Sequence, residues 1–125
     1  MRTIKFRGKR LDNGELVYGD YHRRAGNVHT IIAMEPDKYG KVFYAVNQVI
    51  PDTVGQFTGL LDKNGKEIYF GDIVRNKYGD MGSVIWFSDW SIRVDWGGGD
   101  IHFIDPEWGL EVISNIHDNP ELLKQ

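Results

Sequence analysis

Apolar and basic side chains alternate at the start of the chain. Residues 4–11 place Ile, Phe and Gly between Lys and Arg, and this period of two predicts a strand with one buried face. Asn13 and Gly14 follow, and both residue types accept the positive φ of a type I′ turn. A two-residue loop would make residues 15–22 the returning strand and place Arg7 opposite Asp20.

Further runs of β-branched and aromatic residues predict strands along the rest of the chain. In the first half these runs are residues 28–34 and 41–50. In the second half they are shorter and lie at residues 67–70, 73–77, 83–87, 92–96, 101–104 and 110–113. Turns rich in Gly or Asp separate the short runs, which is typical of a small SH3-like barrel.

Two local signals refine this picture. At residues 62–66 a two-residue loop would oppose like charges, whereas a type I turn with Gly65 in a left-handed bulge pairs Asp62 with Lys66, so we expect the bulged turn. Near the end of the chain, Asn119 suits an N-cap and Pro120 a first helical position, which predicts a short helix.

We therefore expect a mainly β protein. An N-terminal β-hairpin and meander subdomain, residues 1–58, would pack on an SH3-like barrel subdomain, residues 59–125, with a short C-terminal helix. The boundary is placed loosely between Pro51 and Gly59, because Pro51 biases the preceding residue to extended backbone and cannot donate to a ladder.

Composition narrows the possible chemistry. The 125 residues include no cysteine, which excludes disulfides, thiolate zinc sites and thiol nucleophiles. No signal peptide or membrane span is evident, so a cytoplasmic location is expected. Residues 1–58 carry nine basic against six acidic side chains, and residues 59–125 carry six against twelve. This asymmetry fits attraction between the halves or two surfaces for different partners.

Three ordered blocks of sequence have a familiar pattern. They are residues 4–9 with 17–19 (IKFRGK, VYG), residues 53–60, 62–69 and 71–74 (TVGQFTGL, DKNGKEIY, GDIV), and residues 115–123 (NIHDNPELL). Together they resemble the YopX family of phage and prophage proteins. Phe70 departs from the acidic residue often found there, which bears on a local surface contact. The resemblance implies a mainly β fold with an SH3-like barrel, a phage or prophage origin, and no established catalytic activity.

No motif indicates an enzyme. The four histidines lack HxH or HExxH spacing. Asp100 and His102 share one face of a predicted strand and could hold a metal ion, but a solvated hairpin with polar outward positions is the favoured interpretation. The Gly-rich segment 97–99 lacks the Lys and Ser or Thr of a phosphate loop. We expect no enzymatic activity, no metal and no cofactor.

A basic face on the first hairpin suggests one binding function. Lys5, Arg7 and Lys9 share that face with the aromatic Tyr18, which combines charge with stacking potential for nucleic acid. Against this, Arg7 would be neutralised by Asp20, and exposed strands often carry Lys to prevent edge pairing. Nucleic-acid binding through this hairpin is therefore the alternative hypothesis.

Tryptophans in the second half suggest another binding function. Trp86 and Trp96 are expected in the barrel core, whereas Trp90 and Trp108 lie at turns and are candidate anchors of a protein interface. Local packing over the barrel mouth is the favoured explanation for both. The leading hypothesis is a phage or prophage accessory protein that binds a phage or host protein, with a homo-oligomeric assembly.

Overall fold

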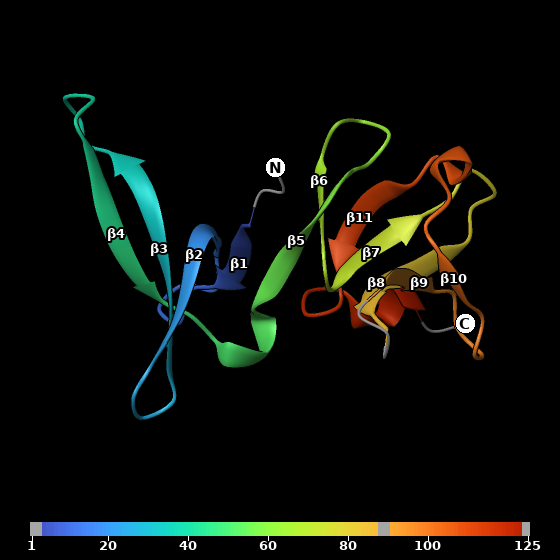
Figure 1. Ribbon diagram of the computed structural model, residues 1–125, viewed down its shortest axis with the longest axis horizontal. Coiled ribbons are helices and arrows are strands. Elements are labelled where there is room, and N and C mark those ends of the chain that lie inside the picture. Colours follow the sequence, from blue (N-terminus) through green and yellow to red (C-terminus); the bar gives the residue numbers. More distant parts are fainter. Residues whose placement is uncertain (1–3, 88–90, 124–125) are drawn as a thin grey trace. The chain divides into compact units, whose positions relative to one another are not determined.

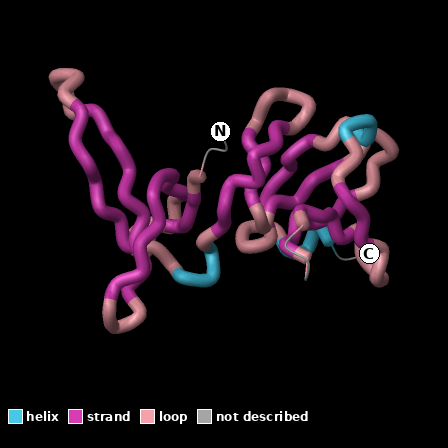
Figure 2. Tube along the Cα trace, in the orientation of Figure 1, coloured by secondary structure: helices cyan, strands magenta, loops and turns pink. Residues whose placement is uncertain are grey.

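Eleven strands form two antiparallel sheets in the part of the chain that the structure, a computed structural model, describes, which is residues 4–87 and 91–123. Figures 1 and 2 show that strands and their turns account for nearly all of the path. The chain divides into two compact units, Met1–Phe57 and Thr58–Gln125. Among the described residues the only helices are short 3-10 turns, and none is long and apolar enough to cross a membrane.

The first sheet has the strand order β4-β3-β2-β1-β5-β6. Its strands are β1 (Phe6–Lys9), β2 (Leu16–Arg24), β3 (Val28–Pro36), β4 (Val42–Gln48), β5 (Gly55–Leu61) and β6 (Glu67–Tyr69). The turn η1 (Pro51–Thr53) joins β4 to β5. A small core of Val17, Ile31, Ala33 and Val49 holds the first unit together. β4 is the last strand of the ladder at one end, as Figure 1 shows.

The first hairpin has a different register from the predicted one. Arg7 pairs with Tyr18 and Phe6 pairs with Gly19, so the predicted pairing of Arg7 with Asp20 is wrong. The shift is two residues, which preserves the alternation, and each side chain therefore keeps its predicted face of the sheet.

Loop length explains the shift. The Arg10 N–H donates to the Glu15 carbonyl at 2.8 Å, so the loop holds four residues instead of two. Gly14 has a φ of 72° but Asn13 does not have a positive φ, whereas a type I′ turn needs both. The Asn13 side chain instead accepts the Glu15 N–H at 2.9 Å.

The boundary region contains a strand that was not predicted. Residues 55–61 form β5, a strand that the hydrophobic pattern did not reveal. It pairs with β1 through Phe6 and Gln56, and the Phe57 N–H donates to the Lys5 carbonyl at 2.7 Å. β5 thus continues the first sheet across the region where the subdomain boundary was placed.

The second sheet has the order β10-β9-β8-β7-β11. Its strands are β7 (Asp72–Arg75), β8 (Met81–Trp86), β9 (Ile92–Asp95), β10 (Ile101–Phe103) and β11 (Glu111–Asn115). The turn η2 (Pro106–Trp108) precedes β11. A core of Ile68, Phe70, Val74, Val84, Val94 and Leu110 fills the second unit.

Two finer expectations for the second unit are not confirmed. Within the described residues β10 does not pair with β11, so hydrogen bonds do not close the sheet, and the SH3-like barrel stays a prediction. The predicted C-terminal helix is a single 3-10 turn, η3 (Pro120–Leu123), which contacts β8. Four residues provide too few hydrogen bonds for a stable α-helix.

One turn geometry occurs three times among the residues that the structure describes. In each case an Asp or Asn Oδ1 accepts backbone N–H groups two and four residues later, and a glycine with positive φ occupies the fourth position. The turns are residues 37–41, 62–66 and 76–80. In the second of them the Asp62 N–H donates to the Lys66 carbonyl at 2.8 Å and Gly65 has a φ of 80°. The bulged turn predicted from the sequence is therefore confirmed.

Candidate functional site

The three basic residues of the predicted nucleic-acid face differ in their surroundings. Arg7 is only 6% exposed, so its side chain is buried. Lys5 holds its ammonium 5.7 Å from the centre of the Phe57 ring. Lys9 is half-buried, and its backbone N–H donates to Thr53 Oγ1 at 2.9 Å. Because the central member is buried, the trio does not form a continuous exposed cationic track.

Of the two candidate anchor tryptophans, the structure describes only Trp108. Trp90 lies outside the described residues. Trp108 is half-buried and packs edge-to-face against Trp96, with ring centres 5.4 Å apart at 78°. Both of these rings line a polar cavity of about 340 Å³ with Asp80 and His102. Trp108 is therefore largely engaged within its own unit.

Trp86 does not have the core position expected from the sequence. It is 40% exposed and stacks on Phe70 with ring centres 3.9 Å apart. Arg93 lies between two other rings, 4.2 Å from the centre of Phe87 and 4.0 Å from that of Phe103. Aromatic surface of the second unit is thus paired with rings or a cation.

The acidic residues near His102 serve mainly in turns. His102 Nε2 lies 2.5 Å from Asp100 Oδ1 on an exposed hairpin. Asp95 accepts the Gly97 N–H, and Asp105 accepts the Glu107 N–H to cap η2, each at 2.9 Å. In the parts of the chain that are described, no group of three or more His, Asp or Glu side chains is placed to hold a metal ion.

A surface that the sequence analysis did not single out lies on the β3–β4 hairpin. Four apolar side chains on one side of this hairpin are more than half exposed, and we call this set the outer face: Met34, Val42, Tyr44 and Val46. Met34 lies directly opposite Tyr44 in the ladder, and Tyr44 is 72% exposed. Contiguous apolar surface of this kind is typical of interaction sites.

The backbone of β4 is also available. The Val49 N–H donates to the His29 carbonyl, and the Asp37 N–H donates to the Lys41 carbonyl. In an antiparallel ladder, hydrogen-bonded pairs alternate with non-hydrogen-bonded pairs. Because residues 41 and 49 are hydrogen-bonded to the neighbouring strand, the odd-numbered residues of β4 direct their N–H and C=O groups toward β3 and the even-numbered residues direct theirs outward. We call the outward groups of Val42, Tyr44 and Val46 the free edge, since no hydrogen bond among the described residues uses them.

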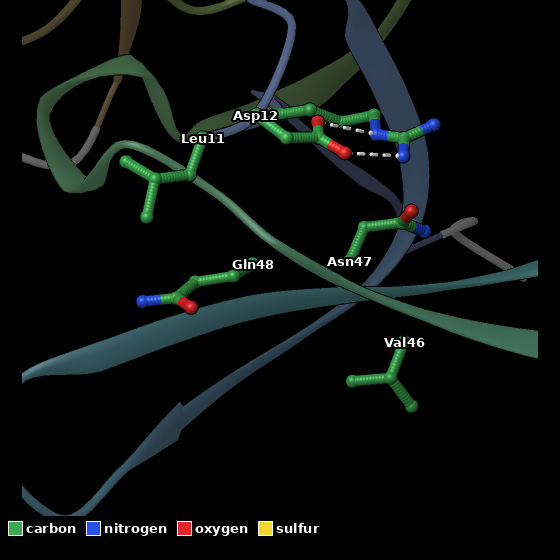
Figure 3. A pocket seen from close by; sticks show the side chains of 6 residues that line it. Leu11, Asp12, Val46, Asn47 and Gln48 are labelled. Atoms are coloured by element: carbon green, nitrogen blue, oxygen red, sulfur yellow. Dashed lines mark hydrogen bonds and ion pairs between the residues drawn. The ribbon is translucent and has the colours of Figure 1, made fainter.

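The free edge ends at a cavity. Leu11 donates its N–H to the outward carbonyl of Gln48 at 2.9 Å, which closes the ladder there. Beside this contact lies a cavity of about 340 Å³, lined by Arg10, Leu11, Asp12 and residues 46–48 of β4. Figure 3 shows Asp12 above this strand, with its carboxylate in a double contact with Arg10. The closer contact is 2.8 Å.

A second apolar cavity lies in the second unit. Its volume is about 320 Å³, and Leu60, Leu61, Ile104 and Pro106 contribute to its lining. Leu61 is more than half exposed. The cavity can accept an apolar side chain, but its backbone neighbours are part of paired strands or turns, so it lacks the hydrogen-bonding edge that β4 offers.

Charges beside this second cavity stabilise the turn at its rim. Burial by itself raises the pKa of the Asp62 carboxyl, but hydrogen bonds from the N–H groups of Val112, Lys66 and Asn64 outweigh it and lower the pKa. A hydrogen bond from Arg75, at 2.8 Å, is the main cause of a lowered pKa at Glu111. Both carboxylates are anchors of the fold rather than acid or base candidates.

The signal for the missed surface was present in the sequence. Residues 42–48 read VFYAVNQ and contain no charged side chain, although exposed edge strands usually carry Lys or another charge. The sequence did not show that this strand lies at the end of the ladder, because that depends on the order in which all strands pair.

Comparisons with known proteins extend over nearly the whole chain. A family model described as YopX protein matches residues 5–124. The crystal structure of protein EF1440 from Enterococcus faecalis is similar over 99% of this chain and 100% of that chain, with 24% sequence identity and a TM-score of 0.63. At this identity the likeness shows a shared fold. No curated protein matches the chain.

Proposed function

The chain belongs to the YopX family, and from this premise we propose that it is a non-enzymatic phage or prophage accessory protein that works by binding other proteins. Its binding surface is the free edge of β4 together with the outer face. The observation that supports this proposal is the strand of residues 42–46, which combines exposed apolar side chains with outward backbone groups and no charge.

Strand addition is the recognition mode that fits this surface. An extended segment that lies beside β4 gains main-chain hydrogen bonds from the free edge, while its side chains pack on the outer face. Leaving such an edge uncovered exposes a protein to unspecific pairing, which charged gatekeepers usually prevent. The absence of such gatekeepers from residues 42–48 supports a specific occupant.

The remaining features of the proposal concern fold and setting. We propose that the second unit is an SH3-like barrel, supported by five short antiparallel strands around one apolar core. The bacterial cytoplasm is the proposed site of action. Nucleic-acid binding has less support, because the buried Arg7 interrupts the basic face on which it depends.

Affinity capture from phage-infected or prophage-induced cells tests the proposed function. The bait is the full chain, compared with Tyr44→Lys, which places a charge on the free edge. Tyr39→Lys is the matched control, because Tyr39 is 82% exposed at the tip of the same hairpin but outside the free edge. A protein partner retained by wild type and Tyr39→Lys but lost from Tyr44→Lys is the expected result.

The captured partner is then purified and its binding to the three proteins measured at two salt concentrations. Binding through backbone and apolar contacts changes little with salt, whereas phosphate contacts weaken steeply. Recovery of nucleic acid alone, with steep salt dependence and equal retention by all three baits, would refute the proposal and favour the basic hairpin.

A further inference from the structure

The free edge has a fixed length. At one end, the turn of residues 37–41 closes the hairpin with a hydrogen bond from Asp37 to Lys41. At the other end, Leu11 occupies the outward carbonyl of Gln48. Between these limits lie Val42, Tyr44 and Val46, and Tyr44 is the midpoint of the window. An added strand must therefore match a window of residues 42–46.

We propose that the occupant of this window is β4 of a second copy of the chain, paired antiparallel about a twofold axis at Tyr44. This inference rests on the proposed function, since it names the partner of the same surface. In this register Tyr44 faces Tyr44 of the second copy, and Val42 faces Val46 of the second copy. The two sheets then become one continuous sheet.

Hydrogen bonding selects this register. Each of the three outward residues offers one N–H and one C=O, so pairing all three with their equivalents forms six hydrogen bonds and uses every group of the free edge. Sliding the strands by two residues in one direction places Val42 opposite Gln48, whose carbonyl already accepts from Leu11. Sliding in the other direction places Val46 opposite Gly40, whose N–H already donates to Asp37.

The side chains also suit a twofold pairing. The window reads Val-Phe-Tyr-Ala-Val, which is nearly the same in both directions, so Val42, Tyr44 and Val46 each meet an apolar residue of the second copy. No charged side chain lies within the window, and like charges therefore do not oppose one another.

Each end of the window places a basic side chain at a cavity. Continuing the register places Lys41 of the second copy opposite Asn47, at the cavity that Figure 3 shows beside Asp12. In that cavity the Asp12 carboxylate is already paired with Arg10, so Lys41 meets a neutral ion pair and no unpaired like charge. The twofold axis repeats this arrangement at the other end.

Single cysteines test the register, because the chain has none of its own. Directly opposite residues of a hydrogen-bonded pair have Cα atoms about 5.5 Å apart, within the range of a disulfide. Tyr44→Cys should therefore cross-link to a covalent dimer under mild oxidation. Val42→Cys alone and Val46→Cys alone should not cross-link, since an offset of four residues separates their Cα atoms by about 13 Å. An equal mixture of these two variants should cross-link.

Sedimentation of the unmodified chain provides the second measurement. We expect wild type and Tyr39→Lys to be dimers at tens of micromolar and Tyr44→Lys to be a monomer with an unchanged circular dichroism spectrum. Tyr44 is exposed in the single chain, so its replacement should leave the fold intact. A monomeric wild type, or equal cross-linking by Val42→Cys alone and by the mixture, would overturn the proposed pairing.

The same variants separate this inference from the proposed function. If wild type is monomeric but Tyr44→Lys loses a captured protein, the surface binds a different partner and the second copy is wrong. If wild type is a dimer with the predicted cross-links but Tyr44→Lys retains every captured protein, the pairing holds and the proposed function at this edge fails.

Discussion

Asp62→Asn is the most informative single change in the second unit. The carboxylate accepts the N–H groups of Asn64 and Lys66 through Oδ1, at 2.8 and 2.9 Å, and the N–H of Val112 through Oδ2, at 2.9 Å. Asn76 forms the same kind of turn with an amide oxygen. The turn should therefore survive in Asp62→Asn. The hydrogen bond from the Val112 N–H should be lost, because the side-chain NH₂ group of the new asparagine would face that N–H and cannot accept from it.

The expected magnitude follows from that contact. Removing the acceptor of a partly buried N–H costs about 1–3 kcal/mol, so we expect the free energy of unfolding to fall by about 2 kcal/mol. Asp37→Asn is the matched control, because Asp37 makes the two turn bonds without a third, distant one. Its effect should stay within about 0.5 kcal/mol.

The pH dependence provides a second signature. The pKa of Asp62 is lowered in the folded protein, so the carboxylate contributes stability above its unfolded pKa of about 3.9. That contribution is lost as pH falls from there through the folded pKa, because the unfolded chain takes up its proton first. The difference between wild type and Asp62→Asn should accordingly be largest near neutral pH and shrink in acid.

Urea unfolding followed by tryptophan fluorescence measures these effects. All four tryptophans lie within residues 86–108, so the fluorescence reports on the second unit, and circular dichroism recorded in the same titration follows the Asp37→Asn control in the first unit. With a slope of about 1 kcal/mol per molar urea, the Asp62→Asn midpoint should fall by about 2 M. Equal midpoints for Asp62→Asn and Asp37→Asn at pH 7, or a difference that persists unchanged in acid, would refute the reasoning.

Three further changes test the packing of each unit. Arg7→Ala should destabilise the first unit by about 2 kcal/mol, and Lys5→Ala by less than about 0.5 kcal/mol, since only the former is buried; equal thermal unfolding by circular dichroism would contradict this. Gly19→Ala should prevent the first unit from folding, because the added Cβ would lie 2.1 Å from the Ile32 carbonyl oxygen. Gly26→Ala is the control: its Cβ would meet nothing within 4 Å, so the free energy of unfolding should fall by only about 1 kcal/mol, the cost of a positive φ. Trp108→Ala should lower the urea midpoint of the second unit through lost packing on Trp96 without changing the sedimentation coefficient; dissociation of an oligomer with unchanged stability would restore Trp108 as an interface residue.

The local pattern of apolar and polar residues was sufficient to predict most strands and some turns. A period of two, or a short run of β-branched residues, marked ten of the eleven strands, because burial of one face acts on each segment separately. The bulged turn at Gly65 was predicted from the opposition of like charges in the alternative loop, and it is confirmed. Three blocks of residues also identified the YopX family, which the match over residues 5–124 shows.

The structure decided the geometry of the first loop and everything that depends on distant partners. A loop of four residues, whose Asn13 side chain binds the Glu15 N–H, shifted the first hairpin and removed the predicted contact between Arg7 and Asp20. The burial of Arg7, which sits between β2 and β5 in the ladder, is likewise invisible in alternation alone. The alternation of residues along a strand shows which face of the sheet a side chain occupies, but not whether neighbouring strands bury that face.

The candidate site shows the same division. The sequence determined that residues 42–48 are an uncharged strand. Only the pairing order β4-β3-β2-β1-β5-β6 put that strand at the end of the sheet, and only the contact of Leu11 with Gln48 limited its free edge to three residues. A strand's hydrogen-bonding edge becomes a binding surface when no other part of the chain pairs with it, and that condition depends on every strand in the sheet at once.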